Sequence, residues 1–411
     1  MARSAVVVGL DLGTTKIAAI VAEVDEKGEV NVVGVGTSPS DGLRRGVVVN
    51  LEKTVNSVRK AVHEAELMAG VRVEEVYAGI AGDHIRSINS RGVIAVTRSG
   101  NEIGQSDIQR VIEQARAVAI PIDREIIHVI PQEFVVDDQT GIKDPVGMAG
   151  VRLEAVVHIV TGAVTSAQNI YKSIDRSGMK IRDLVLQPLA SSYAVLDPEE
   201  RELGVALIDI GGGTTDIAIF YDASIRHTSV VGLGGSNITN DIAIGLRTPR
   251  THAEKIKIKY GSAMAALIDP EAKIKVPGVG GREEREVSAQ VLGSIIEPRL
   301  EEILSLAHRE IKKTDYADLL GAGVVLTGGT ARMVGIAQLA EQIFDLPVKV
   351  GIPKGIGGLT DSVTDPLHAT GVGLVLYGYE NRFKGGLTGV TDHNLFDKIV
   401  DKMKNWFGDL F

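Results

Sequence analysis

The sequence predicts an α/β fold made of two duplicated halves, each a mixed β-sheet flanked by helices. The first observation is an internal repeat: "GLDLGTTKIAAIV" at residues 9–21 and "LIDIGGGTTDIAIF" at residues 207–220 both run from a strand through a Gly-Thr-Thr turn into a second strand. The second is length, because 411 residues exceed what one compact core organises. The third is the different texture of residues 83–161, which indicates a small α/β subdomain inserted into the first half.

Composition limits the class of protein. Hydrophobic residues make up 44% and charged residues 24%, the balance of a folded chain rather than a disordered one. The net charge of −9 argues against a nucleic-acid binder held by phosphate contacts, and the absence of cysteine excludes disulfides, thiolate catalysis and sulfur-based zinc sites. The opening "MARSAVVVGL" lacks a signal-peptide pattern, and no uncharged apolar run approaches the ~20 residues of a membrane span. We therefore expect a cytosolic protein, or one attached to a membrane from the cytosolic side.

The first half begins with an alternating pattern over residues 5–24, which predicts a β-hairpin. Apolar residues then recur at helical spacing from Leu51 to Met68, which predicts a helix. The other elements expected in this half lie on both sides of the insertion: strands at 29–37, 73–82 and 181–187, and helices at 165–178 and 188–196.

The second half opens at Gly204 and continues into the glycine-rich hairpin. A long helix is expected over 289–313, interrupted by Pro298 because proline removes a helical hydrogen bond. The remaining expected segments are helices at 237–246 and 250–261, a turn-rich stretch at 262–288, a strand, glycine turn and helix within 321–344, a closing helix at 366–380 and a flexible linker at 381–393.

The repeated turn has the chemistry of a phosphate site. Glycine lets a phosphate approach the backbone closely, and consecutive N–H groups with threonine hydroxyls form a concave anion site. Asp11 and Asp209, one in each copy, stand where Mg²⁺ needs carboxylates, often through water, and Lys16 would neutralise β- and γ-phosphates. Two ordinary β-turns are the alternative, which the matching aspartates disfavour. A P-loop is excluded because no G-x-x-x-x-G-K-[ST] precedes a helix, and a strand after the glycines argues against a dinucleotide-binding fingerprint.

Two further glycine turns suit the rest of a nucleotide. "GLGGSNIT" at 232–239 and "LTGGTARM" at 326–333 each end a strand with Gly-Gly and are expected to start a helix, whose N-terminus favours negative charge. Glu254 and Lys257 lie three residues apart on one helical face and suit ribose hydroxyls and an adenine edge. A solvated ion pair is the alternative interpretation of these two residues, and only the surrounding motifs weigh against it.

These motifs carry a resemblance to a known family. Together "DLGTTK", "LQPLASS", "DIGGGTTD", "GGSNIT", "LTGGTARM" and "ATGVGLVLYG" resemble the actin/Hsp70/sugar-kinase ATPase superfamily, and "NDIAIGLRTP", "VPGVGGR" and "IEPR" resemble the bacterial cell-division protein FtsA family within it. The resemblance covers nearly the whole chain. It implies an actin-like two-domain fold in which the usual subdomain 1B is missing and a different module, the SHS2-like subdomain 1C, stands elsewhere. The implied divisions are 1A over 1–82 and 162–203, 1C over 83–161, 2A over 204–243 and 319–380, and 2B over 244–318.

The resemblance also implies roles for individual residues. Asp11 and Asp209 would hold Mg²⁺, and Gln187 stands where actins carry the glutamine that orients the attacking water. Arg282, in the 2B subdomain, is our candidate contact for the acidic C-terminal tail of FtsZ, with a solvated loop charge as the equal alternative. The residues expected to bind ATP are Gly13, Thr14, Thr15, Lys16, Gly211, Gly212, Gly213, Thr214, Thr215, Gly234, Gly235, Asn237, Glu254, Lys257, Gly328, Gly329, Thr330 and Met333.

The last eighteen residues, "NLFDKIVDKMKNWFGDLF" at 394–411, predict an amphipathic helix. Charged residues lie off its apolar stripe, and mid-membrane charges cost about 2.5–3.5 kcal/mol each, so the helix is expected to lie on a membrane surface. A helix docked on its own domain is the alternative. The stripe consists of Leu395, Phe396, Ile399, Val400, Met403, Trp406, Phe407, Leu410 and Phe411.

By this resemblance we expect a non-enzymatic, ATP-binding scaffold that hydrolyses ATP weakly at most. It would polymerise with itself and anchor FtsZ to the cytoplasmic face of the bacterial cell membrane at the division site, with other division proteins binding subdomain 1C and no nucleic acid involved. An ATP-dependent sugar-type kinase and a pilus-assembly relative of FtsA are the alternatives. The kinase would need a substrate base that cannot be singled out, and the pilus protein would lack the terminal helix. An Hsp70-like chaperone is not expected, because a substrate-binding domain would follow residue 380 and the residues that follow predict a linker and one helix.

Overall fold

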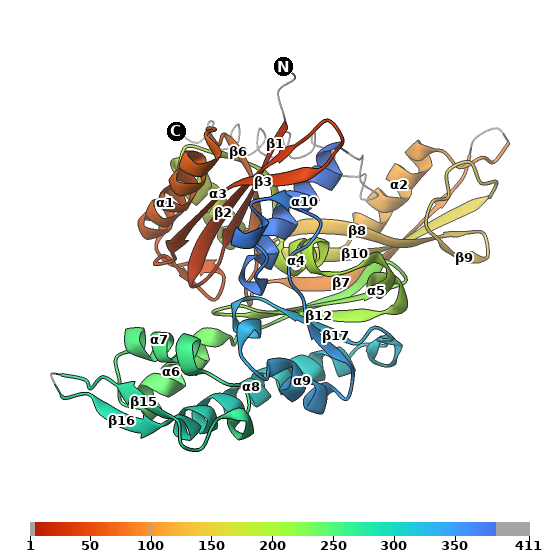
Figure 1. Cartoon of the computed structure of the whole chain (residues 1–411). Coiled ribbons are helices and arrows are strands. Elements are labelled where there is room, and N and C mark those ends of the chain that lie inside the picture. The colour runs from red at the N-terminus through yellow and green to blue at the C-terminus, as the bar shows by residue number, and fades with distance from the viewer. Residues whose placement is uncertain (1–4, 98–99, 281, 384–411) are drawn as a thin grey trace.

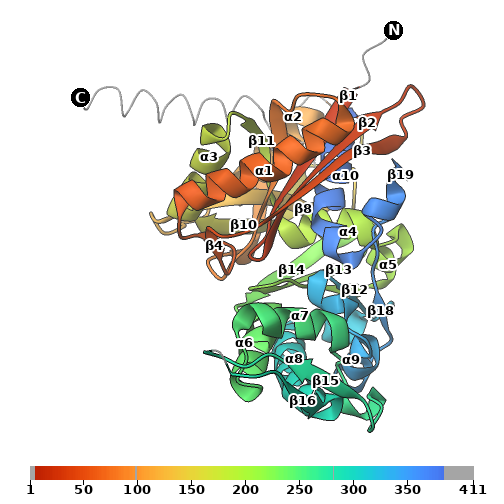
Figure 2. The same ribbon diagram turned by 60° about the vertical axis from the view of Figure 1, so that its left-hand side comes forward.

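The computed structural model describes residues 5–97, 100–280 and 282–383. Two α/β halves are stacked one above the other, and a smaller α/β insert projects from the side of the first half (Figures 1 and 2). The chain leaves the first half through the short helix α5 (Pro198–Leu203) and rejoins its sheet at strand β19 (Gly357–Gly358). The 3₁₀ turn η5 (Pro366–His368) then contacts the second half once more, at Gly328, before the chain continues into helix α10 (Ala369–Phe383) of the first half.

A six-stranded mixed sheet forms the centre of the first half, in the order β11-β6-β1-β2-β3-β19. In the predicted hairpin β1 pairs antiparallel with β2, while β6 and β11 add in parallel. Both hairpin strands are nearly continuous buried runs and do not alternate, because helices cover both faces of the sheet. The strands are β1 (Ala5–Leu12), β2 (Lys16–Val24), β3 (Val30–Pro39), β6 (Glu75–Ile80), β11 (Lys180–Leu186) and β19 (Gly357–Gly358), and β4 (Leu43–Arg44) pairs with β5 (Val47–Val48) nearby.

Helices cover both faces of this sheet (Figure 2). On one face, α1 begins at an Asn50 cap that accepts a hydrogen bond from the Lys53 amide and ends where Gly70 takes a left-handed conformation. Its buried stripe of Val55, Val58 and Val62 is the one that the helical spacing predicted. The helices of this half are α1 (Leu51–Ala69), α3 (Val164–Arg176), α4 (Gln187–Val195) and α10 (Ala369–Phe383).

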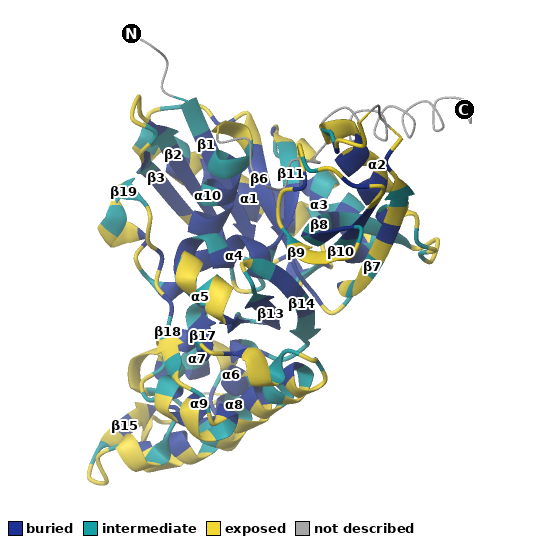
Figure 3. Ribbon diagram, turned by 90° about the vertical axis from the view of Figure 1, so that its right-hand side faces the viewer, coloured by how far each residue is buried: buried dark blue, intermediate teal, exposed yellow. Residues whose placement is uncertain are grey.

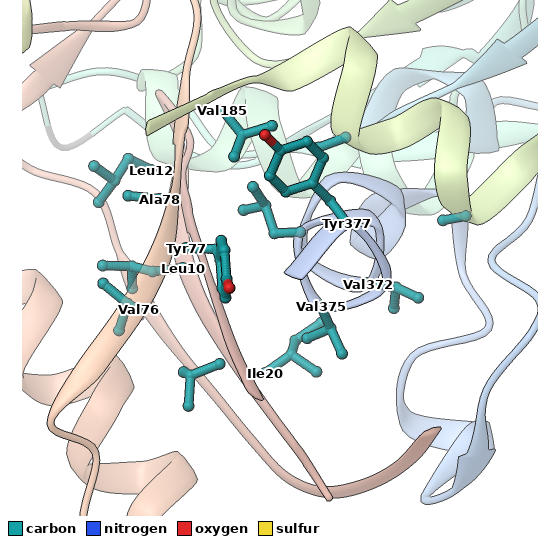
Figure 4. Packing of buried hydrophobic residues seen from close by; sticks show 14 of the residues in the cluster. Leu10, Leu12, Ile20, Val76, Tyr77, Ala78, Val185, Val372, Val375 and Tyr377 are labelled. Carbon is teal, nitrogen blue, oxygen red and sulfur yellow. The ribbon is translucent and has the colours of Figure 1, made fainter. Parts of the chain in front are cut away.

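Helix α10 packs against the other face of the same sheet. Its Tyr377 lies edge-on to Tyr77 of β6, with 6.1 Å between ring centroids, among the buried side chains that Figure 4 labels. The Tyr377 hydroxyl donates to an Asp183 carboxylate oxygen at 2.7 Å, which satisfies the one polar atom of a buried ring. Helix α10 is thus fixed firmly to the first half.

The insert interrupts the first half between β6 and α3. It is a four-stranded antiparallel sheet in the order β7-β10-β8-β9, covered by helix α2 on one face. It has its own apolar core, which includes Val111, Leu153 and Val157. Its elements are β7 (Arg86–Ala95), α2 (Gln105–Arg116), β8 (Arg124–Val136), β9 (Gln139–Ile142) and β10 (Arg152–Ala163).

The second half repeats the plan of the first. Its five-stranded sheet has the order β14-β13-β12-β17-β18, again with an antiparallel hairpin and a parallel strand beside it. The helices α6, α8 and α9 bury their apolar faces against one side of the sheet. The elements are β12 (Val205–Ile210), β13 (Thr215–Tyr221), β14 (Ser224–Val231), α6 (Gly235–Gly245), α7 (Arg250–Tyr260), β15 (Lys273–Val276), β16 (Arg285–Ser288), α8 (Ala289–Lys312), β17 (Val324–Thr327), η3 (Gly329–Arg332), α9 (Ile336–Phe344) and β18 (Val348–Val350).

Four local expectations were wrong. Helix α8 is not interrupted at Pro298, because Ile296 and Leu300 on either side of it are fully buried and the packing offsets the lost hydrogen bond. The turn-rich stretch 262–288 contains the hairpin β15–β16, whose strands are only four residues long. After the 326–333 turn comes the 3₁₀ turn η3, and α9 starts later, at Ile336. Residues 381–383 continue α10 rather than opening a linker.

The buried apolar side chains form three cores. Figure 3 shows buried segments in both halves and in the insert. One core belongs to the insert and another lies between the second sheet and its helices. The third joins the two halves, because Leu207 and Phe220 of the second sheet pack in the same cluster as Val195 and Leu186 of the first half. The two halves therefore share a core at their junction.

Candidate functional site

A cleft of about 410 Å³ lies between the two halves and is lined by both. The tips of the two repeated hairpins form its floor, α7 and the 328–334 turn form one wall, and residues 366–370 pass beside it. The predicted site residues that line this cleft are Asp11, Gly13, Thr14, Thr15, Lys16, Gln187, Asp209, Gly211, Gly212, Thr214, Gly235, Glu254, Lys257, Gly328, Gly329, Thr330 and Met333.

Four predicted binding residues support the cleft instead of lining it. The Thr215 hydroxyl donates to the Leu233 carbonyl at 2.9 Å, and the Asn237 side chain accepts from the Gly234 amide at 3.1 Å as the cap of α6. Gly234 packs so tightly that a Cβ would lie 2.7 Å from the Gly211 carbonyl oxygen. Gly213 faces the other hairpin, where a Cβ would lie 2.6 Å from the Thr14 hydroxyl.

The two hairpin tips have the same length in the structure. Leu12 pairs with Ile17 in the first, and Ile210 pairs with Thr215 in the second, so that each turn contains four residues. The second copy reads Gly-Gly-Gly-Thr-Thr where the first reads Gly-Thr-Thr, and its two more glycines do not enlarge the turn. A Cβ on Gly212 would lie 2.4 Å from Cγ2 of Thr15, so the tips touch each other across the cleft floor.

Three carboxylates are buried around this floor. Burial raises the pKa of Asp11 to about 6, although Lys16 opposes the shift. Burial also raises the pKa of Asp209, despite hydrogen bonds from Ser191 at 2.8 Å and Thr370 at 3.2 Å. Burial and the charge of Asp209 raise the pKa of Asp216 to about 7. A cation at this place would relieve the repulsion between these like charges.

Asp216 has one oxygen, Oδ1, without a hydrogen-bond partner among the described residues, and its side chain is 3% exposed. Its other oxygen accepts from the Thr214 hydroxyl at 2.9 Å. Within the ranges described, no group of three His, Asp or Glu side chains converges closely enough to hold a metal ion. The carboxylates thus suit an ion that keeps water or ligand oxygens in its coordination shell.

Gln187 stands at the start of α4, directly after β11, and its side chain points to the floor of the cleft. Its amide nitrogen donates to Asp11 Oδ1 at 3.3 Å. Gly79 of the neighbouring strand leaves just enough room, because a Cβ there would lie 3.0 Å from Gln187 Cγ. The prediction that Gln187 lies beside the site agrees with this geometry, and its role stays a prediction.

The wall formed by α6 and α7 is polar and already bonded internally. The Lys257 ammonium donates to the Gly235 carbonyl at 3.1 Å and to Glu254 at 2.9 Å, and the Thr239 hydroxyl also contacts Glu254. At the mouth of the cleft, Ile258 and Val334 expose about two-thirds of their surface beside Met333. An apolar mouth above a polar wall suits a flat ring carried on a hydroxylated group.

Sequence reasoning missed five residues that shape the site: Asp216, Ser191, Thr370, Arg332 and His368. Asp216 ends the quoted motif "DIGGGTTD", so its position after the second Thr-Thr could have found it. Ser191 lies in "LQPLASS" and Thr370 in "ATGVGL", but neither has a local pattern that indicates a partner 18 or 161 residues away. Arg332 lies within the quoted turn "LTGGTARM", which could have indicated it, whereas His368 lies directly before "ATGVGLVLYG" and outside every quoted motif.

Arg282 lies far from the cleft, exposed in the segment that joins β15 and β16 at the tip of the second half (Figure 1). The predicted membrane residues, which lie within 395–411, are outside the described residues, as is the linker from residue 384 onward. None of the helices in the described ranges combines the length and the apolar character that crossing a bilayer requires.

Two halves of like topology around a shared cleft, with an insert in the first, define an actin-like protein. Solved structures agree with this fold. A chain of the PilM–PilN type IV pilus biogenesis complex superposes with a TM-score of 0.66 at 15% identity, covering 91% of this chain and 98% of its own. MreB5 of Spiroplasma citri, in a structure bound to AMPPNP, gives a TM-score of 0.54 at 15% identity, covering 97% of this chain and 98% of its own.

Sequence comparison narrows the class to one family. Residues 206–373 match the family described as "Cell division protein FtsA", and residues 82–161 match "SHS2 domain inserted in FTSA". The cell division protein FtsA of Pseudomonas aeruginosa is 48% identical over 97% of each chain, and that of Escherichia coli K12 is 42% identical over 92% of this chain and 91% of its own. The chain belongs to the FtsA family of cell-division proteins.

The family assignment confirms the predicted resemblance, the actin-like fold and the SHS2-type insert. It makes the chain an actin-like cell-division protein that acts at the division site. The likeness to the pilus complex extends to the fold alone, because identity there is 15% against 48% for the P. aeruginosa FtsA relative. Neither the pilus alternative nor the sugar-kinase alternative gains support from these comparisons.

Proposed function

We propose that this protein is an ATP-dependent scaffold that polymerises and tethers FtsZ filaments to the cytoplasmic face of the bacterial cell membrane. The observation that carries the proposal is the meeting of the two glycine hairpins, one from each half, across the floor of a single cleft. A polyphosphate on that floor would be gripped from both sides. Its binding would favour the closed arrangement of the halves, because a ligand shifts the equilibrium toward the state that it contacts better.

The chemistry of the cleft fits ATP. Glycine-rich turns expose backbone N–H groups to the floor, and the Lys16 ammonium and the Thr14 and Thr15 hydroxyls add donors. The volume of about 410 Å³ lies in the range of small-molecule sites. The solved structures of MreB5 in complex with ADP and with AMPPNP, which share the fold, support a nucleotide here by analogy.

Mg²⁺ fits the same floor. Asp11 and Asp209 would hold it, directly or through water, and the unpartnered oxygen of Asp216 gives a further acceptor for a coordinated water. When bound, the ion would neutralise charge between the carboxylates and the phosphates. Lys16 would contribute positive charge from the first hairpin, and the backbone amides of Gly212 to Thr214 would orient the phosphates from the second, because the Gly211 amide already donates to the Thr214 carbonyl at 3.0 Å.

Weak ATP hydrolysis is compatible with this arrangement, and Gln187 is the residue that we propose to position water. Its amide is bonded to Asp11, so it would have to rotate or share that bond to orient a nucleophile. We therefore propose a scaffold in which ATP serves mainly as a clamp, and not an enzyme that turns over a small-molecule substrate. Subdomain boundaries at 82, 161, 203, 243, 318 and 380 belong to the same proposal.

The exposed β15–β16 hairpin is the proposed contact for the acidic tail of FtsZ. Lysines on β15 are paired across the hairpin, Lys273 with Glu286 and Lys275 with Glu284, each at 3.9 Å. Among the described residues, Arg282 has no ion pair, so its charge is available to a partner. We propose that other division proteins bind the insert and that copies of this chain associate through their halves as actin-like proteins do.

The apolar stripe within 394–411 supplies the proposed membrane attachment. The three lysines of the segment 394–411 balance its three aspartates, so burial of apolar side chains would provide most of the affinity for the membrane. Many weak helices on one polymer would combine into tight attachment.

Co-sedimentation with lipid vesicles and FtsZ, with and without ATP and Mg²⁺, tests the proposal. The full chain should carry FtsZ to vesicles more strongly with ATP. Deletion of 394–411, or Trp406→Glu with Phe407→Glu, should release both proteins, whereas Asp401→Asn with Lys402→Gln, off the stripe, should not. Arg282→Glu should keep vesicle binding and lose FtsZ. Flotation of the truncated chain with vesicles would contradict the anchor, and failure of ATP to bind in a direct titration would contradict the clamp.

A further inference from the structure

One hydrogen bond beside the cleft floor involves His368, a residue to which the proposed function assigns no role. The Lys16 ammonium nitrogen lies 3.2 Å from Nδ1 of His368, across 352 residues of sequence. Lys16 lines the cleft, whereas His368 lies behind it and is 9% exposed. His368 belongs to η5, the turn that contacts Gly328 of the second half after β19 has rejoined the sheet of the first half.

The chemistry of the pair fixes its protonation. An ammonium group has only donors, so Nδ1 must accept and the imidazole must be neutral, with its proton on Nε2. Burial, and then the charge of Lys16, lowers the pKa of His368 to about 4, which agrees with this assignment. A neutral acceptor orients the ammonium group without cancelling its charge. A carboxylate in the same place would orient it and neutralise it.

The backbone of η5 holds the imidazole in place from the second half. One Asp365 oxygen caps the turn by accepting from the Leu367 amide at 2.9 Å, and the other accepts from Arg332 at 3.0 Å. The Pro366 carbonyl accepts from the Gly328 amide at 3.2 Å. His368 is thus attached to the glycine turn that walls the cleft, and its side chain reaches the lysine of the first hairpin.

Lys16 has competing partners on the other side. The carboxylates of Asp11, Asp365 and Asp209 attract Lys16, and the charge of Arg332 opposes them. Asp365 is paired with Arg332 at 3.0 Å, so without an acceptor at His368 the flexible lysine would turn toward the buried Asp11, where its charge would no longer face a phosphate. Side chains that must be ordered on binding reduce affinity, so a lysine that is held in advance favours it.

We infer that His368 is a positioning residue for the polyphosphate of the bound nucleotide, which holds the Lys16 ammonium at the cleft and away from Asp11. The inference rests on the proposed function, since it assumes that ATP occupies the cleft. It also gives η5, which contacts the second half at Gly328, a direct bond to the phosphate-binding lysine. Movement of the halves around a ligand would therefore change the position of Lys16 itself.

Calorimetric titration with ATP, ADP and adenosine, in Mg²⁺, tests the inference on the full chain. His368→Phe keeps an aromatic ring and removes the acceptor. It should weaken ATP and ADP binding about tenfold, the lower end of what a hydrogen bond to a charged group contributes, and change adenosine binding less than twofold. His368→Asn, whose amide oxygen can take the place of Nδ1, should restore most of the affinity. In a Lys16→Met background, His368→Phe should have no further effect, because the pair is coupled.

The outcomes distinguish the positioning role of His368 from the proposed ATP-dependent function. If the wild-type chain binds no ATP, the proposed function fails before His368 is tested. If the wild type binds ATP and His368→Phe binds it equally well or more tightly, the positioning role is overturned. An equal loss for adenosine, no rescue by asparagine, or a full effect in the Lys16→Met background would overturn it too, because each indicates damage to the turn. His368→Leu serves in the same cycle should the phenylalanine variant not fold.

Discussion

The three carboxylates at the cleft floor differ in what surrounds them. Asp209 accepts hydrogen bonds from Ser191 and Thr370, which favour its charged form, whereas Asp216 has a single hydroxyl donor and one unpartnered oxygen. Burial and the charge of Asp209, opposed by this one donor alone, raise the pKa of Asp216 to about 7. Keeping a carboxyl group such as that of Asp216 away from water lowers the stability of the protein, and such groups are typical of ligand sites.

The ligand-free protein should lose stability as pH rises because of Asp216. Folding raises the pKa of this carboxyl from 3.8 to about 7, so the folded state holds a proton that the unfolded state has lost. The contribution of Asp216 to the free energy of unfolding is therefore retained below pH 4 and falls from about pH 4 to pH 7, by on the order of 2–4 kcal/mol.

Asp216→Asn removes this titration. Urea unfolding without nucleotide or Mg²⁺ should give similar stabilities for the two proteins near pH 4.5, and at pH 7.5 the variant should be the more stable. Comparison at the same pH cancels the contribution of every other group. An advantage of the variant that is the same at both pH values would show that Asp216 does not titrate in this range.

At the scale of residues, sequence predicted the parts of the site that repeat. Asp11 and Asp209 were found because each ends the first strand of a copy, and the glycines because strands rarely contain them. Ser191 and His368 could not be found, since their roles depend on Asp209 and Lys16, which are distant in sequence. A hydrogen bond across 352 residues leaves no local pattern.

At the scale of elements, the second hairpin tip is held by the turn that follows β14. The Gly235 and Ser236 amides donate to the Gly211 and Gly212 carbonyls at 2.9 and 2.8 Å. Gly234 lies at the centre of this contact, with an extended backbone (φ −168°) that any residue can adopt. The need for glycine at 234 is therefore a matter of space and not of backbone conformation.

Gly234→Ala should separate the tip from α6. Its Cβ would lie 2.7 Å from the Gly211 carbonyl oxygen, and backbone cannot move aside as a flexible side chain can. We expect a loss of about 1–3 kcal/mol in the free energy of unfolding and at least tenfold weaker ATP binding. Gly232→Ala is the matched control, because a Cβ there has no atom closer than Arg45 Nη1 at 4.0 Å. Equal behaviour of the two variants in thermal melting and ATP titration would contradict this account.

Apolar periodicity predicted most of the long helices and strands, as the buried stripe of α1 shows. The wrong predictions have physical causes. Propensity alone ends a helix at Pro298, but α8 continues because its buried face spans the proline. The hairpin β15–β16 was missed because Ile274 and Val276 alone are buried on β15, too few residues to establish alternation.

At the scale of the whole molecule, the insert and the second half meet along a polar seam. Strand β14 is an edge strand, and side chains of the insert bond its outward carbonyl groups. Ser87 donates to Thr228 at 3.0 Å, Asn89 to Arg226 at 3.3 Å and Gln132 to Ile225 at 2.7 Å. His158 bridges Asn89 and Thr228, and burial, with nearby His227, lowers its pKa to about 3, so it stays neutral. No pattern in the sequence predicts this contact between the insert and β14.

The seam and the shared core should therefore respond differently to mutation. The halves are joined by apolar burial, which fails only with global unfolding, whereas the seam contains side-chain hydrogen bonds worth about 0.5–1.5 kcal/mol each and the partly exposed Lys143–Asp222 ion pair at 2.7 Å. Asn89→Ala with Gln132→Ala should allow the insert to open from β14 locally. Hydrogen exchange should become faster at residues 86–90 and 224–228, while the central strand β17 keeps its protection. Gln114→Ala, at an exposed position of α2 and so away from the seam, should leave both regions unchanged. Faster exchange across β17 as well would mean that the seam is part of the global fold, and that the insert cannot move independently when the cleft closes.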